Sequence, residues 1–194
     1  MSLLLDTIAR HVVLTAEEQQ CVLDLLETRR YKAKTQLQQT GMVCSESYFV
    51  NSGILRSFTY DDHAHERVLN FAGPGWWMAD LYSLYSGLPG ILNIDVIAYA
   101  EVHVLSKANQ ELMYREIPKM ERFFRILVEN ALVAQQQRML DNMMLSAEQR
   151  YDKFCAKFPG LIANVPQKLI ASYIGVTPEF FSKMKAARLR GGIS

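Results

Sequence analysis

The feature that most constrains this fold is Gly175, a corner residue between two short helical segments. Glycine adopts the left-handed backbone that ends a helix more easily than other residues. Before it, residues 167–174 carry apolar side chains at helical spacing, with the small Ala171 where a second helix would cross closely. After it, Thr177 followed by Pro178 is the preferred order for a helix start. The pattern predicts a helix-turn-helix.

The second helix of this pair is predicted to have one apolar and one polar face. Phe181 and Met184 point to the core, which leaves Glu179 and Lys183 facing outward. In the major groove of DNA, a carboxylate can accept a hydrogen bond from cytosine N4, and a lysine can donate to guanine O6 and N7. The alternative is a helical hairpin with no nucleic-acid partner. The predicted contacts to double-stranded DNA are Gln167, Thr177, Glu179, Ser182, Lys183, Lys185 and Arg188.

The charge distribution agrees with a polyanionic partner at this end of the chain. The last 30 residues carry five basic side chains against Glu179 alone, a net charge of +4, whereas the whole chain carries +1. Lys185, Arg188 and Arg190 are expected to neutralise DNA phosphates, which adds affinity without sequence preference. Each of these side chains taken alone is equally compatible with an ordinary solvated charge.

The region from residue 31 to residue 106 is predicted to be rich in β-strands. Residues 54–60 alternate between two faces, residues 61–63 are typical of a turn, and residues 66–71 form the returning strand. Residues 94–104 alternate in the same way. Several short strands at regular spacing predict a sandwich or a jelly roll.

Helices are predicted on either side of this region. Residues 1–30 contain Thr15 followed three residues later by Glu18, the spacing of a capping box at a helix start. Ser146 and Gln149 repeat that spacing near the other end of the chain. Both pairs satisfy backbone N–H groups that a first helical turn leaves free, so they predict where two helices begin.

Residues 107–145 are predicted to form a long helix, with Pro118 in an early turn where proline is tolerated. Apolar residues follow along it at steps of three and four, a spacing typical of the seam between two paired helices. We expect this seam to join two subunits, and the alternative is packing against the chain's own sheet. The seam consists of Met120, Phe124, Leu127, Ala131 and Ala134.

Together these segments predict an α+β fold with an N-terminal β jelly-roll sensor domain, a long dimerisation helix and a C-terminal helix-turn-helix domain. The expected bounds are residues 1–111, 112–145 and 146–194. A homodimer of this layout would place two recognition helices in successive major grooves of a near-palindromic site, about one helical turn apart. The sequence therefore favours a sequence-specific DNA-binding regulator.

The same order of elements resembles the Crp–Fnr family of transcription regulators. Residues 48–56, 148–151 and above all 165–179 carry the resemblance. The family's recognition helix often has the pattern Glu-x-x-Ser-Arg, and here it is Glu179-Phe-Phe-Ser182-Lys183. Lysine lacks the bidentate fork of arginine, so the usual half-site preference is not expected to carry over. The resemblance implies a homodimer with an effector in the β-domain, and RNA polymerase as a second candidate partner besides DNA.

The resemblance also indicates where an effector would bind. In the family, a cyclic-nucleotide sensor holds the phosphate with backbone amides and an arginine, and the ribose hydroxyl with a glutamate. Here Ala79 replaces a glycine, Asp80 stands for the glutamate, and the arginine position falls near Leu92. No Arg or Lys lies between Arg67 and Lys107, so a buried phosphate would lack its charged partner. We therefore expect no cyclic-nucleotide cofactor. The candidate effector contacts are Trp77, Ala79, Asp80, Leu81 and Leu92.

Other classes of function find little support in the sequence. The three cysteines are scattered and lack the spacing of a zinc or iron–sulfur site. An enzyme with a jelly-roll metal site would have to take its ligands from His63, His65, Glu66 and His103, and we expect neither a metal nor catalytic residues. The main alternative is a cyclic-nucleotide-binding module that signals through protein contacts, against which the missing arginine argues.

The sequence also bears on where the protein acts. No apolar run approaches the roughly 18 residues that a membrane span requires. The short apolar stretch at the start of the chain has no basic residue before it, as a signal peptide would need. We expect no membrane partner and a cytoplasmic location.

Overall fold

Two antiparallel sheets of four strands each form the centre of the protein. The computed structural model describes residues 2–191, the last three of them by their backbone alone. One sheet has the strand order β1-β8-β3-β6 and the other β2-β7-β4-β5. The strands are β1 (Glu27–Tyr31), β2 (Gln36–Gln38), β3 (Glu46–Ser52), β4 (Leu55–Tyr60), β5 (Glu66–Ala72), β6 (Trp77–Met78), β7 (Asn93–Val96) and β8 (Ala100–Ser106).

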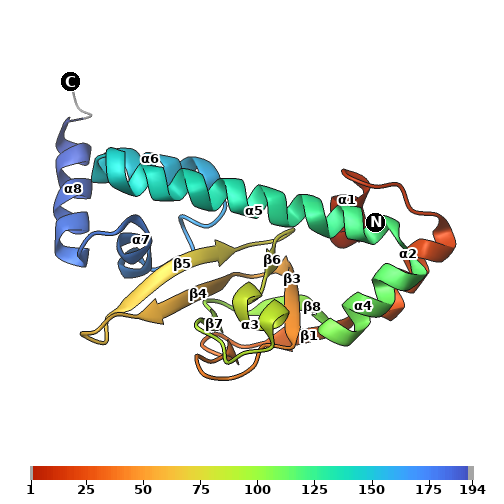
Figure 1. Cartoon of the computed structure of the whole chain (residues 1–194). Coiled ribbons are helices and arrows are strands. Elements are labelled where there is room, and N and C mark those ends of the chain that lie inside the picture. The colour runs from red at the N-terminus through yellow and green to blue at the C-terminus, as the bar shows by residue number, and fades with distance from the viewer. Residues whose placement is uncertain (1, 192–194) are drawn as a thin grey trace.

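Except for α3, which lies among the strands near β7, the helices lie along one side of the sheets and at both ends of that side (Figure 1). The long helix α5 runs above the strands, with α1, α2 and α4 near its beginning and α6, α7 and α8 near its end. The helices are α1 (Leu3–Ala9), α2 (Ala16–Asp24), α3 (Leu81–Ser86), α4 (Lys107–Glu116), α5 (Lys119–Met144), α6 (Ala147–Lys157), α7 (Gln167–Ile174) and α8 (Pro178–Gly191).

The α+β class predicted from the sequence is confirmed, and so is the hairpin of β4 and β5. These strands pair from Leu55 opposite Ala72 to Tyr60 opposite Glu66. In the turn between them, the Asp61 carboxylate accepts backbone hydrogen bonds from residues 63 and 65 at 3.0 and 2.9 Å. Eight strands in two sheets are what a jelly roll contains, and the jelly-roll topology itself stays a prediction.

The prediction of helix through residue 30 is wrong at its end. The Thr15 capping box is present and α2 follows it, but the helix stops at Asp24 and Glu27–Tyr31 form a strand paired with β8. The Thr28 hydroxyl lies 2.9 Å from Nδ1 of His103, 75 residues later in the chain. A capping box shows where a helix begins and not where it ends, and here pairing with a distant segment determines the structure of residues 27–31.

The helix predicted over residues 107–145 is in fact two helices, α4 and α5, and the predicted dimerisation helix starting at residue 112 therefore begins at Lys119. The break falls at Ile117, whose backbone has φ −133° and ψ 79°. Ile117 precedes Pro118, and the ring of a proline disfavours helical backbone in the residue before it. α4 therefore ends at Glu116, and α5 begins as a separate helix at Lys119, after the proline.

The first half of the seam predicted along this helix faces the chain's own core. Met120 and Phe124 are buried in a cluster with α1 and α4, and Leu127 packs against that cluster. The two alanines of the seam are exposed. Packing against the chain itself, the alternative drawn from the sequence, is therefore correct here. Periodicity shows that a helix has an apolar face, but it does not show what covers that face.

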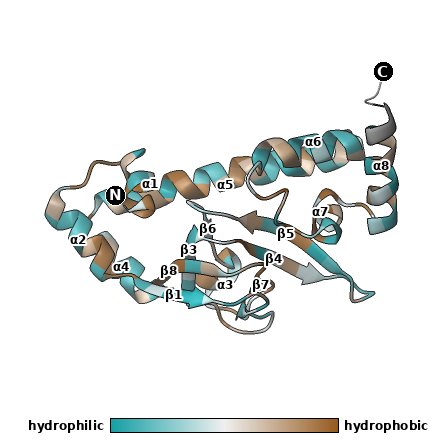
Figure 2. Cartoon of the chain, turned by 180° about the vertical axis from the view of Figure 1, so that it is seen from behind, coloured by the Kyte–Doolittle hydropathy of each residue, from teal (hydrophilic) through white to brown (hydrophobic). Residues whose placement is uncertain are grey.

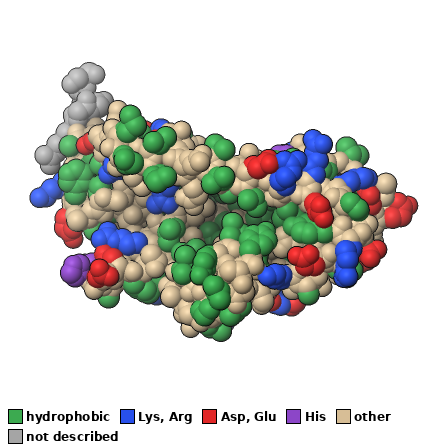
Figure 3. Space-filling view, viewed as in Figure 1, with side chains coloured by type: hydrophobic (Ala, Val, Ile, Leu, Met, Phe, Trp, Pro, Cys, Tyr) green, Lys and Arg blue, Asp and Glu red, His purple; other side chains and the backbone are tan. Residues whose placement is uncertain are grey.

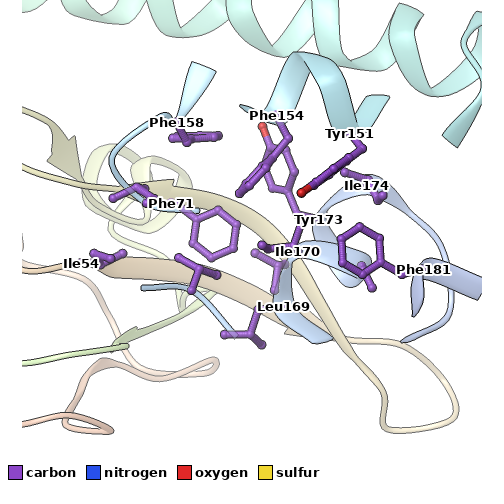
Figure 4. Close-up of a cluster of buried hydrophobic side chains, with 14 of the residues drawn as sticks. Ile54, Phe71, Tyr151, Phe154, Phe158, Leu169, Ile170, Tyr173, Ile174 and Phe181 are labelled. Carbon is purple, nitrogen blue, oxygen red and sulfur yellow. The ribbon is translucent and has the colours of Figure 1, made fainter. Parts of the chain in front are cut away.

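The helix-turn-helix shares a hydrophobic core with the sheet that contains β4 and β5 (Figure 4). The ring of Phe71 lies 5.5 to 5.9 Å from the rings of three aromatic residues of the helical region. In Figure 2, hydrophobic residues of β5 and α7 lie side by side. Burying one large apolar side chain stabilises a fold by roughly 1.5–3 kcal/mol, so this core couples the two parts strongly. Its main members are Ile54, Phe58, Val68, Phe71, Tyr151, Phe154, Phe158, Leu169, Ile170, Tyr173, Ile174 and Phe181.

Candidate nucleic-acid interface

The corner between α7 and α8 has the geometry predicted from the sequence. Gly175 has φ +76° and ψ 37°, the left-handed conformation that ends a helix. The Val176 amide donates to the carbonyl of Ala171 at 3.0 Å, which satisfies one of the last carbonyls of α7. The chain then enters α8 at Pro178, so only three residues lie between the two helices.

The two helices pack through the residues that the sequence assigned to the core. Ala171 is fully buried, and Val176 packs against the same cluster from beneath the turn. Phe181 is also buried, and its ring meets the ring of Tyr151 on α6 edge to face with centroids 5.2 Å apart. Buried Met184 completes the inner face of α8. One side of α8 is therefore fixed to the protein and the opposite side faces solvent.

The outer side of α8 starts from a capped helix end. The Thr177 hydroxyl accepts a hydrogen bond from the Phe180 amide at 3.2 Å. Glu179 and Lys183 are exposed, and neither side chain makes a hydrogen bond or ion pair with the described part of the chain. Exposed Ser182 donates its hydroxyl to the Pro178 carbonyl at 2.9 Å and keeps an oxygen lone pair for an outside donor. Glu179 and Lys183 are therefore held on a rigid helix with their polar ends available.

The other predicted DNA contacts differ in how available they are. Gln167 is exposed in the first turn of α7. Lys185 is half-buried, with its ammonium 5.8 Å from the centroid of the Phe181 ring. Arg188 forms an ion pair with Asp152 of α6 at 2.5 Å, which raises its pKa. The side chain of Arg190 lies outside the described part of the chain.

The predicted effector residues include Asp80, whose carboxylate already accepts hydrogen bonds from backbone amides. Asp80 is fully buried and caps α3, because its Oδ1 accepts from the Ser83 amide at 3.2 Å. Its Oδ2 accepts from the amides of Ile91 and Leu92 at 2.9 and 3.0 Å. Asp80 and Leu92 are therefore close together as the sequence analysis expected, but the contact is a structural one.

The remaining candidates of that set are scattered around α3. The Trp77 ring packs 5.4 Å from the rings of both Phe49 and Phe124, which places it in the hydrophobic core. Ala79 is half-buried and Leu81 is exposed. An effector site at these residues stays a prediction.

Several solved structures match the fold over most of the chain. FixK2 from Bradyrhizobium japonicum superposes with a TM-score of 0.76 at 18% identity, covering 87% of this chain and 86% of that chain. The c-di-GMP-responsive global regulator CLP of Xanthomonas campestris gives 0.74 at 15% identity, covering 91% and 93%. A transcriptional regulator of the Crp/Fnr family from Eubacterium rectale gives 0.70 at 16% identity, covering 92% and 85%. The chain has the Crp/Fnr fold. No protein-family model matches the sequence, and no curated protein does.

Within the Crp/Fnr fold, one exposed residue of α8 was missed by the sequence analysis. Phe180 lies between Glu179 and Ser182 and is 48% exposed, although it is a large apolar side chain. Phenylalanine can contact the methyl group of thymine in the major groove. The signal was present in the sequence, because Phe181 and Met184 define the inner face and leave Phe180 on the outer one.

The other residues singled out in the sequence do not converge on a metal site. The described residues contain no group of three or more His, Cys, Asp or Glu side chains that could hold a metal ion. His63 and His65 lie in the β4–β5 turn, whereas His103 lies on β8 in the other sheet. The three cysteines are free thiols. In residues 2–191, no helix combines the length and the apolar character needed to cross a membrane.

Proposed function

We propose that this protein is a transcription regulator of the Crp/Fnr type that binds double-stranded DNA with sequence preference. The observation that carries the proposal is the outer face of α8, where Glu179 and Lys183 project from a capped, well-packed helix with no partner among residues 2–191. A recognition helix needs such a face, because its first turns meet base edges in the major groove. RNA polymerase is a further partner in this proposal, and the place of action is the cytoplasm.

Phosphate contacts would come from the basic residues around this face. The last 30 residues carry a net charge of +4 on a chain of net charge +1. Lys183, Lys185 and Arg188 all lie on α8. Arg188 would have to exchange its ion pair with Asp152 for a phosphate. We therefore assign sequence preference to Glu179 and Lys183 and general affinity to the surrounding charges.

A homodimer is part of the proposal, and the outer face of α5 supports it. Val128, Leu132, Met139 and Met143 follow at steps of four, seven and four, so they share one face of the helix. All four are exposed, by 42 to 78%. Figure 3 shows hydrophobic side chains exposed along this helix. A second copy of α5 would remove this apolar stripe from water, which is the usual reason for helix pairing. This stripe lies on a different face from the seam predicted from the sequence.

The regulator is proposed to work without a cyclic nucleotide at Asp80 and without catalysis. The Asp80 carboxylate already accepts from three amides and is fully buried, so it presents no exposed oxygen to a ribose hydroxyl. The segment between Arg67 and Lys107 offers no cation for a phosphate. Leaving a buried phosphate without a positive partner is strongly unfavourable.

In vitro selection of duplexes from a random pool tests this function, followed by competition binding with single-base variants of the selected site. Glu179→Ala should reduce the preference at one base pair per half-site by about 1–3 kcal/mol. The matched control is Glu111→Ala, which removes an exposed glutamate of α4 far from α8 and should leave every preference unchanged. Unaltered base preference in the Glu179→Ala protein, or a wild-type protein that ignores duplex DNA at low salt, would contradict the proposal.

A further inference from the structure

A cavity of about 440 Å³ lies between α5, α6 and α7, at the junction of the long helix with the helix-turn-helix. It is open to solvent on one side and is separate from Asp80 and from the outer face of α8. Small-molecule sites commonly enclose about 300–1,000 Å³. The lining residues are Ala134, Gln137, Arg138, Asp141, Asn142, Arg150, Lys153, Phe154, Ala156, Lys157, Tyr173 and Ile174.

The charged residues of this cavity are mostly positive. It is lined by Arg138, Arg150, Lys153 and Lys157 against a single carboxylate, Asp141. That carboxylate is already paired with Lys153 at 2.6 Å. Within residues 2–191, the other three cations form no ion pair. The cavity therefore has an excess of positive charge that its own carboxylate does not balance.

Two of these cations are held by backbone carbonyls. The Arg138 guanidinium donates to the carbonyls of Val68, Leu69 and Tyr173 and lies 4.1 Å from the centroid of the Tyr173 ring. Arg150 donates to two further carbonyls, at the ends of α5 and α7. Carbonyl dipoles fix the direction of a guanidinium, but they carry no net charge with which to neutralise it.

Lys157 is the cation with the fewest partners. Its ammonium lies 5.1 Å from the centroid of the Phe158 ring and 5.6 Å from that of Trp76. Burial and the neighbouring Arg138 lower its pKa, and burial lowers the pKa of Arg138 as well. Both shifts have the direction that burial gives to a cation, and for Lys157 the positive charge of Arg138 adds to it. An anion in the cavity would reverse them.

The uncharged part of the lining combines the polar side chains of Gln137, Asn142 and Tyr173 with several apolar ones. Ala134 of α5, Phe154 and Ala156 of α6, and Ile174 of α7 face the same space as the cations. Phe154 and Ile174 belong to the buried core drawn in Figure 4, so the exposed apolar surface of the lining comes from Ala134 and Ala156. An inorganic anion would leave this apolar surface in contact with water. A neutral hydrocarbon would cover the apolar surface but leave the cations without a counter-charge.

We propose that this cavity binds a small organic anion with a flat aromatic body, of the chemical class of aromatic carboxylates and sulfonates. The acid group lies toward Lys157 and Arg138, and the ring lies against Ala134 and Ala156, the exposed apolar residues of the lining. Such a ligand touches α5 and α6 together, so it fixes the orientation of the helix-turn-helix relative to the long helix. Its effect on DNA affinity rests on the function proposed above, whereas its binding does not.

The probe for the test is 1-anilinonaphthalene-8-sulfonate, an aromatic sulfonate whose fluorescence rises on binding. N-phenyl-1-naphthylamine, which has the same rings and no sulfonate, is the neutral comparison. The folded wild-type chain should bind one sulfonate probe saturably, and salt should weaken that binding. Lys157→Gln should weaken it by roughly tenfold through loss of a charge-assisted contact, and should leave binding of the neutral probe unchanged. Lys32→Gln removes an exposed lysine elsewhere and should change neither.

A second variant tests the location without altering charge. Ala134→Phe fills the cavity and should abolish binding of the sulfonate probe. Val133→Phe, at the next position on an exposed face of α5, should leave it intact. Equal binding of the sulfonate and neutral probes to every variant, or full binding by Ala134→Phe, overturns the site. DNA binding is measured separately on the same proteins, so loss of one activity with the other retained identifies which proposal has failed.

Discussion

Phe180 allows the proposed docking of α8 on DNA to be tested through the methyl group of a single thymine. Its ring is 48% exposed beside Glu179 and Lys183, so its removal should not disturb the core. If the ring contacts a thymine methyl, exchanging that thymine for uracil should weaken wild-type binding by about 1 kcal/mol. The Phe180→Ala protein should be indifferent to the same exchange. Competition binding with the two duplexes measures the difference, and equal sensitivity of both proteins would rule the contact out.

Arg56 is a residue on which the sheet itself depends. It is buried in β4, and its guanidinium binds Asp95 of β7 at 2.8 Å and Glu66 of β5 at 2.6 Å. Replacing it leaves two carboxylates without their cation, so Arg56→Gln should lower the free energy of unfolding by about 3–5 kcal/mol. The double variant Arg56→Gln with Asp95→Asn should regain part of that loss, because it removes one orphaned charge. Urea unfolding measures both, and a double variant less stable than the single one would refute this account.

At the scale of elements, the sequence was informative where the signal is local. Both capping boxes, at Thr15 and at Ser146, are present in the structure, because the residues that make them lie three positions apart. β1 was missed because its partner strand lies far along the chain. The hydrogen bonds that the amides of residues 91 and 92 donate to the Asp80 carboxylate were missed for the same reason. Pro118 was predicted to be tolerated early in one helix, but it separates α4 from α5, because a proline disfavours helical backbone in the residue before it.

The contact between α7 and β5 depends on one serine as well as on apolar packing. The Ser172 hydroxyl donates to the carbonyl of Glu66 at 2.7 Å and accepts from the amide of Val68 at 2.9 Å. Ser172→Ala leaves both backbone groups without that partner, and should lower the free energy of unfolding by about 1–3 kcal/mol. Faster hydrogen exchange at the Val68 amide should accompany the loss. Ser182→Ala on exposed α8 is the matched control, expected within about 0.5 kcal/mol of wild type. Equal effects of the two changes would mean that Ser172 does not anchor α7.

For the whole molecule, the shared core limits how the parts can move. The sequence predicted three consecutive units, but Phe71 of the sheet packs among aromatic rings of α6 and α7. Both faces of β4 are therefore covered: Leu55 lies between the two sheets, and Phe58 lies in the core shared with the helices. No pattern within the strand could reveal this, since alternation shows two faces without showing that both are buried. Any effector must act against this packing to reorient α8.

The proposed homodimer is the arrangement of the whole molecule that the proposed function needs most. Leu132 is 58% exposed at the centre of the α5 stripe, whereas its neighbour Val133 is 63% exposed on a different side of the helix. Leu132→Asp would place a charge in an apolar helix pair and should convert the dimer to monomers at micromolar concentration, with loss of cooperative binding to a two-half-site duplex. Val133→Asp adds the same charge outside the stripe and should remain dimeric. Sedimentation equilibrium distinguishes the two. If the Leu132→Asp protein sediments as a dimer, like the wild type, then the α5 stripe does not join the subunits. In that case the stripe does not set the distance between the two α8 helices either.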